Sequence, residues 1–320
     1  MLKDKNSAKI NKNSKILIAV AAILTITYFL SFTKSCSSQD KREKVKTALV
    51  NQKYKESIKE ILLQDATGSI KLTNEGAFWT VARITESQNG PLQLRIDLPA
   101  SQERINNLLE ELTKIRNLYK ISDKINKNSS LGLTNGTEFH IRYTCDDSIF
   151  RELIFGNQDF SLSSRYMMTG ENTQVYEIDS SLDTYLTTSV QNWTEPFIIS
   201  RQVLNTDIQS IAVTFTDETN HKTLNKLDGN SAEANKLLDL RHGGLPTNDQ
   251  ILDIKDTLIT LKLEIENGDK TSIKMNIKPF DSGETYLVET VYYDSEGWQI
   301  YNSYSTISSW TYNKIKEITL

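Results

Sequence analysis

An uncharged apolar run near the N-terminus, Ile16–Phe32 (ILIAVAAILTITYFLSF), constrains this chain more than any other part of its sequence. As an α-helix it would extend about 26 Å, the short end of what a bilayer requires. Ten of its residues are Ile, Leu, Val or Phe, which favour insertion. We therefore expect one transmembrane helix over residues 16–33, after a basic cytoplasmic tail (1–15) and before a stalk (34–60).

Cys36 follows this run and raises the alternative of a lipoprotein signal. Lipoprotein signals place small or apolar residues just before the lipidated cysteine, whereas Thr33, Lys34 and Ser35 precede it here. Small residues at the spacing of an ordinary cleavage site are also missing near Phe32. The sequence favours an uncleaved anchor over lipidation, which makes Cys36 a free thiol beside the membrane.

The charges on the two sides of the apolar run are balanced. Five lysines precede it and five Lys or Arg residues follow it before residue 47, so the positive-inside rule decides little. The α-amino group and the single acid of the tail, Asp4, mildly favour an N-terminus on the inside. The rest of the chain is acidic, within a net charge of −4, which argues against nucleic acid as a partner.

Beyond residue 60 the hydrophobic pattern changes between strand and helix periods. GSIKLT and AFWTVARI predict one hairpin, and EFHIRY and IFRELIFG, around TCDDS, predict another. Between the hairpins, an amphipathic helix over about 100–118 is predicted by apolar residues at helical spacing, namely Ile105, Leu108, Leu109, Leu112 and Ile115. The 320 residues suffice for two domains, and the fold class is α+β with mostly antiparallel β-sheet.

An offset of 122 residues relates the second half of the chain to the first. It superposes hairpins 137–156 and 259–278, with turns at Asp146 and Gly268, and places VYEID and WQIYN on the same strand. We predict two related modules with one amphipathic helix each, over 61–193 and 207–320, joined by a linker at 194–206. The alternative is that the two hairpins match only because β-hairpins in general share this pattern, without a duplication.

The offset also predicts which side chains are buried. One set on each hairpin should face the core: Phe139, Ile141 and Tyr143 on the first, and Leu261, Leu263 and Ile265 on the second. His140 and its equivalent Lys262 should lie on the opposite faces.

The order of motifs in the first half resembles a bacterial family of unknown function, number 4340. The resemblance covers about residues 60–215 and rests on the proline before the helix, INNLLEELTKI, LGL at 131–133, FRELIFGNQD, SSRYMMTGENTQVYEIDSSLDTYL and the Trp of QNWTEP. Members occur in extracytoplasmic auxiliary subunits of gliding-motility-type ABC transporters and as stand-alone anchored proteins. The resemblance implies a fold and protein partners, but brings no catalytic residues.

The histidines do not form a pattern typical of catalysis or metal binding. His140 is predicted on the polar face of its strand, and His221 lies in a polar stretch. His242 precedes Gly243 and Gly244 at the end of a predicted helix, where a cation suits the helix dipole and glycine the C-cap. No two histidines have metal-ligand spacing. We therefore predict no catalytic, cofactor-binding or metal-binding residues.

Other polar and aromatic features have structural explanations. Two aspartates beside Cys145 in CDDS would raise the thiol pKa, the reverse of activation, so a turn is expected there. DSEG and ENGD lack the spaced oxygen ligands of a calcium loop. The four tryptophans are expected in the core or at a module boundary: Trp79, Trp193, Trp298 and Trp310.

These observations predict a non-enzymatic, membrane-anchored extracytoplasmic protein, an accessory component of an ABC-transporter or gliding-motility-type envelope complex. Its body would face the periplasm or the cell exterior from the bacterial inner membrane, with protein partners and no cofactor. The alternative is a stand-alone cell-surface module that binds a small molecule, a glycan or a host protein. A large aromatic-lined pocket would favour that alternative.

Overall fold

The chain divides into two compact units, Met1–Lys44 and Val45–Leu320. The computed structural model describes residues 20, 24–25, 43–84, 97–124, 130–134, 136–147, 149–170, 173–204, 208–216, 221–223, 227–247, 250–251, 259–266, 271–280 and 283–319.

The first unit contributes few of these residues. Val20, Leu24 and Thr25 are helical. Among the described helices, none combines the length and the apolar character that crossing a bilayer requires. The remainder of the predicted transmembrane helix (16–33), the basic tail and Cys36 lie outside the described residues, as does the predicted stalk up to residue 42.

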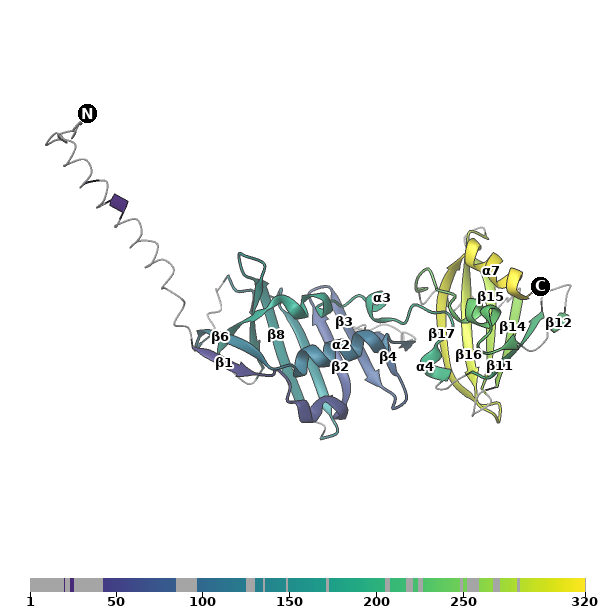
Figure 1. Ribbon diagram of the computed structural model, residues 1–320, viewed down its shortest axis with the longest axis horizontal. Coiled ribbons are helices and arrows are strands. Elements are labelled where there is room, and N and C mark those ends of the chain that lie inside the picture. Colours follow the sequence, from purple (N-terminus) through teal and green to yellow (C-terminus); the bar gives the residue numbers. More distant parts are fainter. Residues whose placement is uncertain are drawn as a thin grey trace, which may run out of the picture. The chain divides into compact units, whose positions relative to one another are not determined.

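The second unit contains two β-sheets with several helices, and the predicted class of mostly antiparallel β-sheet is confirmed (Figure 1). The first sheet has ten strands in the order β1-β6-β10-β9-β8-β7-β2-β3-β4-β5. Their bounds are β1 Lys44–Thr47, β2 Ile58–Asp65, β3 Gly68–Asn74, β4 Trp79–Ile84, β5 Leu98–Pro99, β6 Arg116–Ser122, β7 Phe139–Cys145, β8 Phe150–Gln158, β9 Ser164–Thr169 and β10 Val175–Asp179.

The second sheet has seven strands in the order β12-β11-β14-β15-β16-β17, with β13 also paired to β11. Its strands are β11 Ser210–Thr216, β12 His221–Thr223, β13 Leu227–Asp228, β14 Ile259–Glu266, β15 Ser272–Phe280, β16 Thr285–Tyr293 and β17 Gln299–Ser308. The helices of the unit are η1 Gln52–Ser57, α2 Gln102–Thr113, η2 Ser180–Tyr185, α3 Val190–Trp193, α4 Arg201–Leu204, α5 Ala232–Leu238 and α7 Ser309–Thr319.

The two sheets share one strand order. The neighbours β3-β2-β7-β8-β9-β10 of the first sheet correspond, strand for strand, to β12-β11-β14-β15-β16-β17 of the second. In each, a hairpin comes first in the chain, a helix follows (α2 or α5), and a four-stranded meander then pairs with the first hairpin strand. Duplication of a module would produce this correspondence, but the duplication and the boundaries 61–193, 194–206 and 207–320 stay predictions.

The predicted hairpin at 137–156 is confirmed as β7 and β8, with a turn at Asp146 and Asp147. The side chains of β7 alternate between the two faces as predicted, because Phe139, Ile141 and Tyr143 are all buried in one core cluster. His140 lies on the other face of the sheet.

The second predicted hairpin is confirmed as β14 and β15. Its pairs Leu261–Met275 and Leu263–Ile273 are centred on Gly268, the predicted turn residue. The side chains of β14 lie outside the described residues, so the predicted burial of Leu261, Leu263 and Ile265, and the predicted outward face of Lys262, stay predictions.

Pairing across the strands differs between the two hairpins. Ile141 pairs with Leu153 in the first. Their equivalents at the 122-residue offset are Leu263 and Met275, but Leu263 pairs with Ile273 instead. A shift of two residues keeps the same side chains on the same face, but one constant offset does not describe the pairing of both strands.

Helix α2 carries the predicted apolar stripe. Ile105, Leu108, Leu109 and Leu112 are buried, and the Ser101 hydroxyl caps the helix by accepting a hydrogen bond from the Arg104 amide. The stripe packs with strands β2, β3, β4, β7 and β8 of the first sheet in one core cluster.

The predicted end of this helix at about residue 118 is wrong. The helix ends at Thr113, and Ile115 is 65% exposed, although its spacing fits the apolar stripe. Arg116 begins β6 instead, and its buried guanidinium pairs with Glu111 (3.0 Å) and Asp179 (3.2 Å). These ion pairs connect the first residue of β6 to both α2 and β10.

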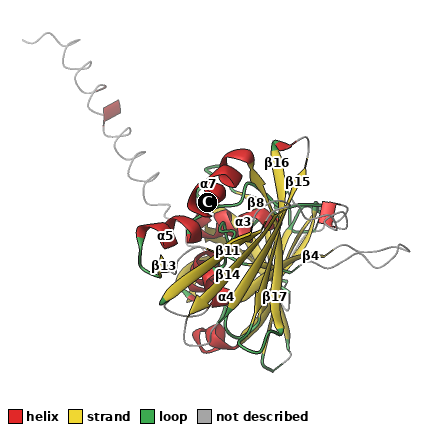
Figure 2. Cartoon of the chain, turned by 90° about the vertical axis from the view of Figure 1, so that its right-hand side faces the viewer, coloured by secondary structure: helices red, strands yellow, loops and turns green. Residues whose placement is uncertain are grey.

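The second sheet has its own core cluster on the side where α5 and α7 lie (Figure 2). α5 contributes Ala234, Leu237 and Leu238 to this cluster, and α7 contributes Ile315. Strands β15, β16 and β17 supply most of the opposing side chains, namely Ile273, Met275, Ile277, Val288, Tyr292 and Ile307.

The LGL motif at 131–133 covers part of the outer face of the first sheet. Leu133 forms a small buried cluster there with Ile154 and Val175. The motif crosses β8, where the Asn157 amide donates to the Leu131 carbonyl oxygen at 2.7 Å.

Candidate functional site

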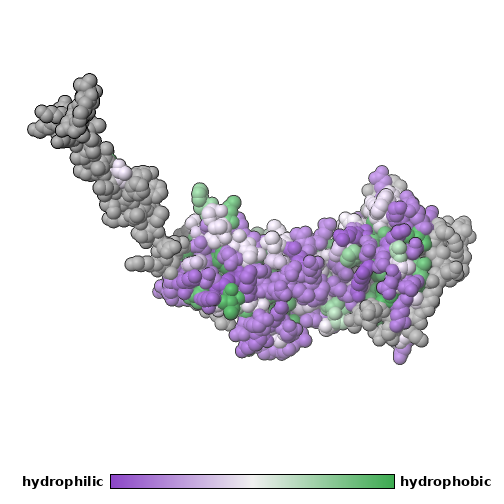
Figure 3. Space-filling view, viewed as in Figure 1, coloured by the Kyte–Doolittle hydropathy of each residue, from purple (hydrophilic) through white to green (hydrophobic). Residues whose placement is uncertain are grey.

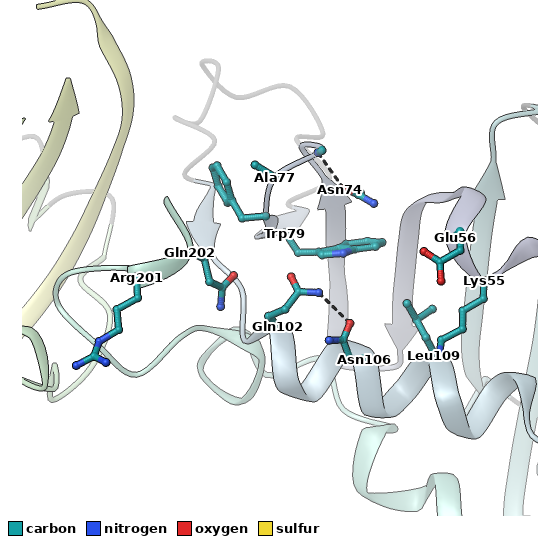
Figure 4. A pocket seen from close by; sticks show the side chains of 12 residues that line it. Lys55, Glu56, Asn74, Ala77, Trp79, Gln102, Asn106, Leu109, Arg201 and Gln202 are labelled. Carbon is teal, nitrogen blue, oxygen red and sulfur yellow. Dashed lines mark hydrogen bonds between the residues drawn. The ribbon is translucent and has the colours of Figure 1, made fainter. Parts of the chain in front are cut away.

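A cleft of about 480 Å³ is a candidate site in the described part of the chain (Figure 4). It lies between η1, the turn from β3 to β4, α2 and α4. Its lining is rich in side-chain amides and consists of Lys55, Glu56, Asn74, Gly76, Ala77, Phe78, Trp79, Gln102, Asn106, Leu109, Arg201 and Gln202.

The β3–β4 turn forms the aromatic side of the cleft. Gly76 has φ +92°, in the region that favours glycine, and its amide donates to Asn74 Oδ1 at 2.9 Å. The Glu75 amide donates to the Phe78 carbonyl at 2.9 Å and closes the turn. These contacts fix Phe78 and Trp79, although Trp79 is only 5% exposed and offers little surface for stacking.

Helix α2 forms the polar side. Gln102 and Asn106 are one turn apart on one helix face, and Gln102 Nε2 donates to Asn106 Oδ1 at 2.8 Å. From α4, Gln202 is directed toward these amides, while Arg201 extends away from them (Figure 4). The Gln202 Oε1 atom is buried and has no hydrogen-bond partner among the described residues.

Charge at the cleft is largely neutralised by neighbouring groups. Lys55 lies 3.8 Å from Glu110, and Arg201 lies 2.6 Å from Asp239. Amides that can both donate and accept therefore dominate its chemistry. Such a lining suits a neutral polar molecule better than a strongly charged one.

A buried polar cluster is centred on Glu195, which comes after the strands of the first sheet in the sequence. The Glu195 amide donates to the Pro99 carbonyl of β5 at 2.8 Å, and its carboxylate accepts a hydrogen bond from the Ser200 hydroxyl. His242 Nε2 donates to the Glu195 carbonyl at 2.9 Å, and the Tyr292 hydroxyl accepts from the Ser200 amide at 2.7 Å. Glu195 and Ser200, both in the predicted linker, are thus hydrogen-bonded to β5 of the first sheet and to β16 of the second.

Burial shifts the pKa values within this cluster. Desolvation raises the pKa of the Glu195 carboxyl to about 7, against the opposing hydrogen bond from Ser200. Desolvation also lowers the pKa of His242. The prediction that His242 lies at a helix end is wrong, because helix α5 ends at Leu238.

The glycines beside His242 also differ from the prediction. Helix α5 ends at Leu238, and Gly243 and Gly244 are not its C-cap. They pair with Thr306 of β17 instead, through bonds of 2.7 and 3.0 Å.

His140 lies on the face of β7 opposite the core, as predicted, but it is not lightly covered, because only 18% of its side chain is exposed. Its Nδ1 lies 2.8 Å from Glu152 Oε1, which also accepts from Arg142 Nε at 2.5 Å. The Arg142 guanidinium donates further to Gln64 at 2.7 Å. This network ties β7 to its neighbours on the outer face of the sheet. The side chain of His221, in β12, lies outside the described residues.

The CDDS stretch forms the predicted turn. Cys145 ends β7 and is buried in the core. Asp147 pairs with Arg151 at 2.6 Å, and this hydrogen-bonded pair lowers the pKa of Asp147 to about 2. Over the described residues, no three or more His, Cys, Asp or Glu side chains gather as they would around a metal ion.

The tryptophan prediction holds for two residues and fails for two. Trp79 and Trp193 are buried, and Trp193 Nε1 donates to the Thr187 carbonyl at 3.0 Å. Trp298 and Trp310 are 71% and 66% exposed. Trp298 follows a turn held by the Asp294 carboxylate, which accepts the Trp298 amide at 2.8 Å and directs this stretch outward.

The model of a family described as "Domain of unknown function (DUF4340)" matches residues 91–241. This stretch of the chain is thus similar to DUF4340. The resemblance predicted from the motifs is confirmed, although the matched stretch begins and ends later than the predicted 60–215. The matched stretch includes β5 to β10 of the first sheet and β11, β12, β13 and α5 at the second. No curated protein and no solved structure matches the chain.

The cleft was not predicted from the sequence. The side-by-side amides of Gln102 and Asn106, on the polar face of a predicted helix, were the one available signal. Arg201 and Gln202 lie in the predicted linker, where no periodic pattern marks them. The stretch that matches DUF4340 contains α2 and α4, whereas η1 and the β3–β4 turn precede it.

Proposed function

We propose that this protein is a non-enzymatic, membrane-anchored component of an extracytoplasmic complex, accessory to an ABC transporter or a gliding-motility-type assembly. The observation that carries the proposal is the order of parts in the chain. The uncharged run Ile16–Phe32 precedes a large β-rich unit that carries a DUF4340 match. Two sheets provide faces and edges for partner subunits. The body faces the periplasm or the cell exterior from the inner membrane.

Purification of the full chain from crosslinked, detergent-solubilised membranes, with mass spectrometry of the captured proteins, tests this proposal. We expect a transporter ATPase and permease to be recovered together with the chain. A matched control replaces Ile23 and Leu24 by arginine, which raises the cost of insertion, and should lose both the membrane fraction and the partners. Recovery of the intact chain alone would contradict the proposal.

The cleft supports a second candidate, a stand-alone surface module that binds a small polar molecule or a glycan. Its volume lies within the range of small-molecule sites, and its side-chain amides can both donate and accept hydrogen bonds. A glycan-array measurement on the full chain tests it. Binding should be lost in Asn106→Leu and kept in Asn313→Leu, which changes an exposed amide on α7. Equal binding by both variants would place the ligand elsewhere.

A further inference from the structure

The turn between β8 and β9 exposes two large apolar side chains. It comprises residues 159–163, with the sequence DFSLS. Phe160 is 106% exposed and Leu162 is 67% exposed, so neither is covered by the rest of the chain. In the view of Figure 3, hydrophobic atoms project beyond the hydrophilic surface above the first sheet. This tip is convex, with small serines beside the apolar residues.

The turn is held rigidly by the Asp159 carboxylate. Asp159 Oδ1 accepts the amides of Ser163 (3.1 Å) and Ser164 (3.0 Å), and Oδ2 accepts the Ser161 hydroxyl at 2.5 Å. The Leu162 amide donates to the Asp159 carbonyl at 3.1 Å. These hydrogen bonds lower the pKa of the Asp159 carboxyl, so the turn keeps one charge at its first residue, while residues 160–163 are uncharged.

The backbone of the turn is also strained. Among the described residues, Leu162 is the one non-glycine residue with a positive φ, at 58°. This conformation is costly for a residue with a Cβ atom, and a glycine would adopt it freely. Strain and exposure thus coincide at one leucine, in a turn that the hydrogen bonds to Asp159 hold in this conformation.

We propose that Phe160 and Leu162 insert into the lipid surface to which the chain is anchored, and so orient the first sheet against the bilayer. A convex pair of apolar side chains fits a fluid apolar phase, whereas a protein partner would need a matching cavity. This inference rests on the proposed membrane attachment. It adds a second, non-covalent contact between the body and the membrane.

The length of the chain supports lipid as the occupant. Eleven residues separate Phe32, at the end of the apolar run, from Lys44, at the start of β1. Fully extended, they span roughly 40 Å, so an anchored first sheet stays near the bilayer. Two apolar side chains bind lipid weakly on their own, but the tether makes insertion an intramolecular event with a high effective concentration.

Spin-label accessibility in liposomes tests the inference on the full chain. Cys36→Ser removes the juxtamembrane thiol, and Cys145 is buried and does not react. Phe160→Cys then carries a nitroxide at the tip. Phe150→Cys is the matched control, because Phe150 is also exposed but lies at the other end of β8, roughly 30 Å away.

We expect the ratio of oxygen to nickel-chelate accessibility to be several-fold higher at position 160 than at position 150. Equal, water-like ratios in a chain that floats with the liposomes would overturn the lipid contact and leave the membrane attachment intact. Failure of both variants and of the parent chain to float with the liposomes would overturn the membrane attachment and the inference together.

Discussion

Gly156 lies so close to Leu131 that a Cβ atom on Gly156 would be 2.1 Å from the Leu131 carbonyl oxygen. Only a residue without a side chain allows the LGL segment to cross β8 at this distance. The same carbonyl accepts the Asn157 amide, so the crossing is hydrogen-bonded as well as close. Two motifs that are 25 residues apart, LGL and the FG of FRELIFG, thus have one structural explanation.

Gly156→Ala should therefore destabilise the protein by about 2–3 kcal/mol, because the added methyl group meets backbone that has no room to relax. Urea unfolding followed by circular dichroism measures the change. Gly243→Ala is the matched control, since its Cβ would meet its nearest atom at an ordinary 3.6 Å. Similar losses in both variants would show that the Leu131 contact is not the cause.

Glu195 should make the stability depend on pH. Burial raises the carboxyl pKa from 4.5 to about 7 in the folded chain, so the folded state binds more protons than the unfolded state between these values. Stability from this group is therefore full below about pH 4.5 and falls as the pH rises to about 7. The total loss is about 3 kcal/mol.

Glu195→Gln should remove this dependence. Its stability relative to the parent chain should rise from pH 5 to pH 8 by up to about 3 kcal/mol, measured by urea unfolding at the two pH values. Glu296→Gln, at an exposed turn position, should show no such rise. A constant difference between Glu195→Gln and the parent chain would mean that Glu195 is ionised in the fold throughout this range.

Arg116→Met should destabilise the chain by about 2 kcal/mol or more. The guanidinium is 3% exposed and connects Glu111 on α2 with Asp179 on β10, so its loss leaves Asp179 without this cation and Glu111 with the exposed Lys114. The matched variant Arg201→Met breaks a 2.6 Å ion pair whose side chains are 47% and 59% exposed, and should cost less than about 0.5 kcal/mol. Thermal unfolding of both variants would show the difference, and equal melting temperatures would contradict it.

Leu162→Gly should stabilise the isolated protein in solution by about 0.5–1 kcal/mol. The change relieves the positive φ, and the exposed leucine side chain contributes little packing. Ser161→Gly, in the same turn, adds the same chain flexibility without relieving a positive φ, and should destabilise. A loss of stability in Leu162→Gly would show that the leucine side chain packs in the turn.

Sequence patterns predicted elements in which one residue type repeats on one face. The alternation of β7 and the stripe of α2 are of this kind, because burial of one face imposes a period. The helical pattern failed at Ile115. Its spacing fits the apolar stripe of α2, but the helix ends at Thr113 and β6 begins at Arg116. The ion pairs of Arg116 favour that boundary, and one of them joins residues 63 positions apart in the sequence.

The cleft could not be predicted by the same reasoning. Its lining comes from four segments, and their approach depends on strand pairing and on contacts of residues in the predicted linker. The outward direction of Trp298 likewise depends on one carboxylate in its turn, while composition alone favours burial of a tryptophan. Local periodicity carries no information about either arrangement.

The pairing of β2 with β7 affects the order in which the strands of the first sheet can pair during folding. Ile61 lies opposite Tyr143, which is 82 residues later in the sequence. While the chain emerges N-terminus first, β2, β3 and β4 can form a meander, but the free edge of β2 stays unpaired until β7 arrives. The first sheet therefore passes through a stage with an open, apolar edge, and its closure requires a contact of high sequence separation. Until β7 pairs with it, this edge of β2 is open to pairing with strands of other chains.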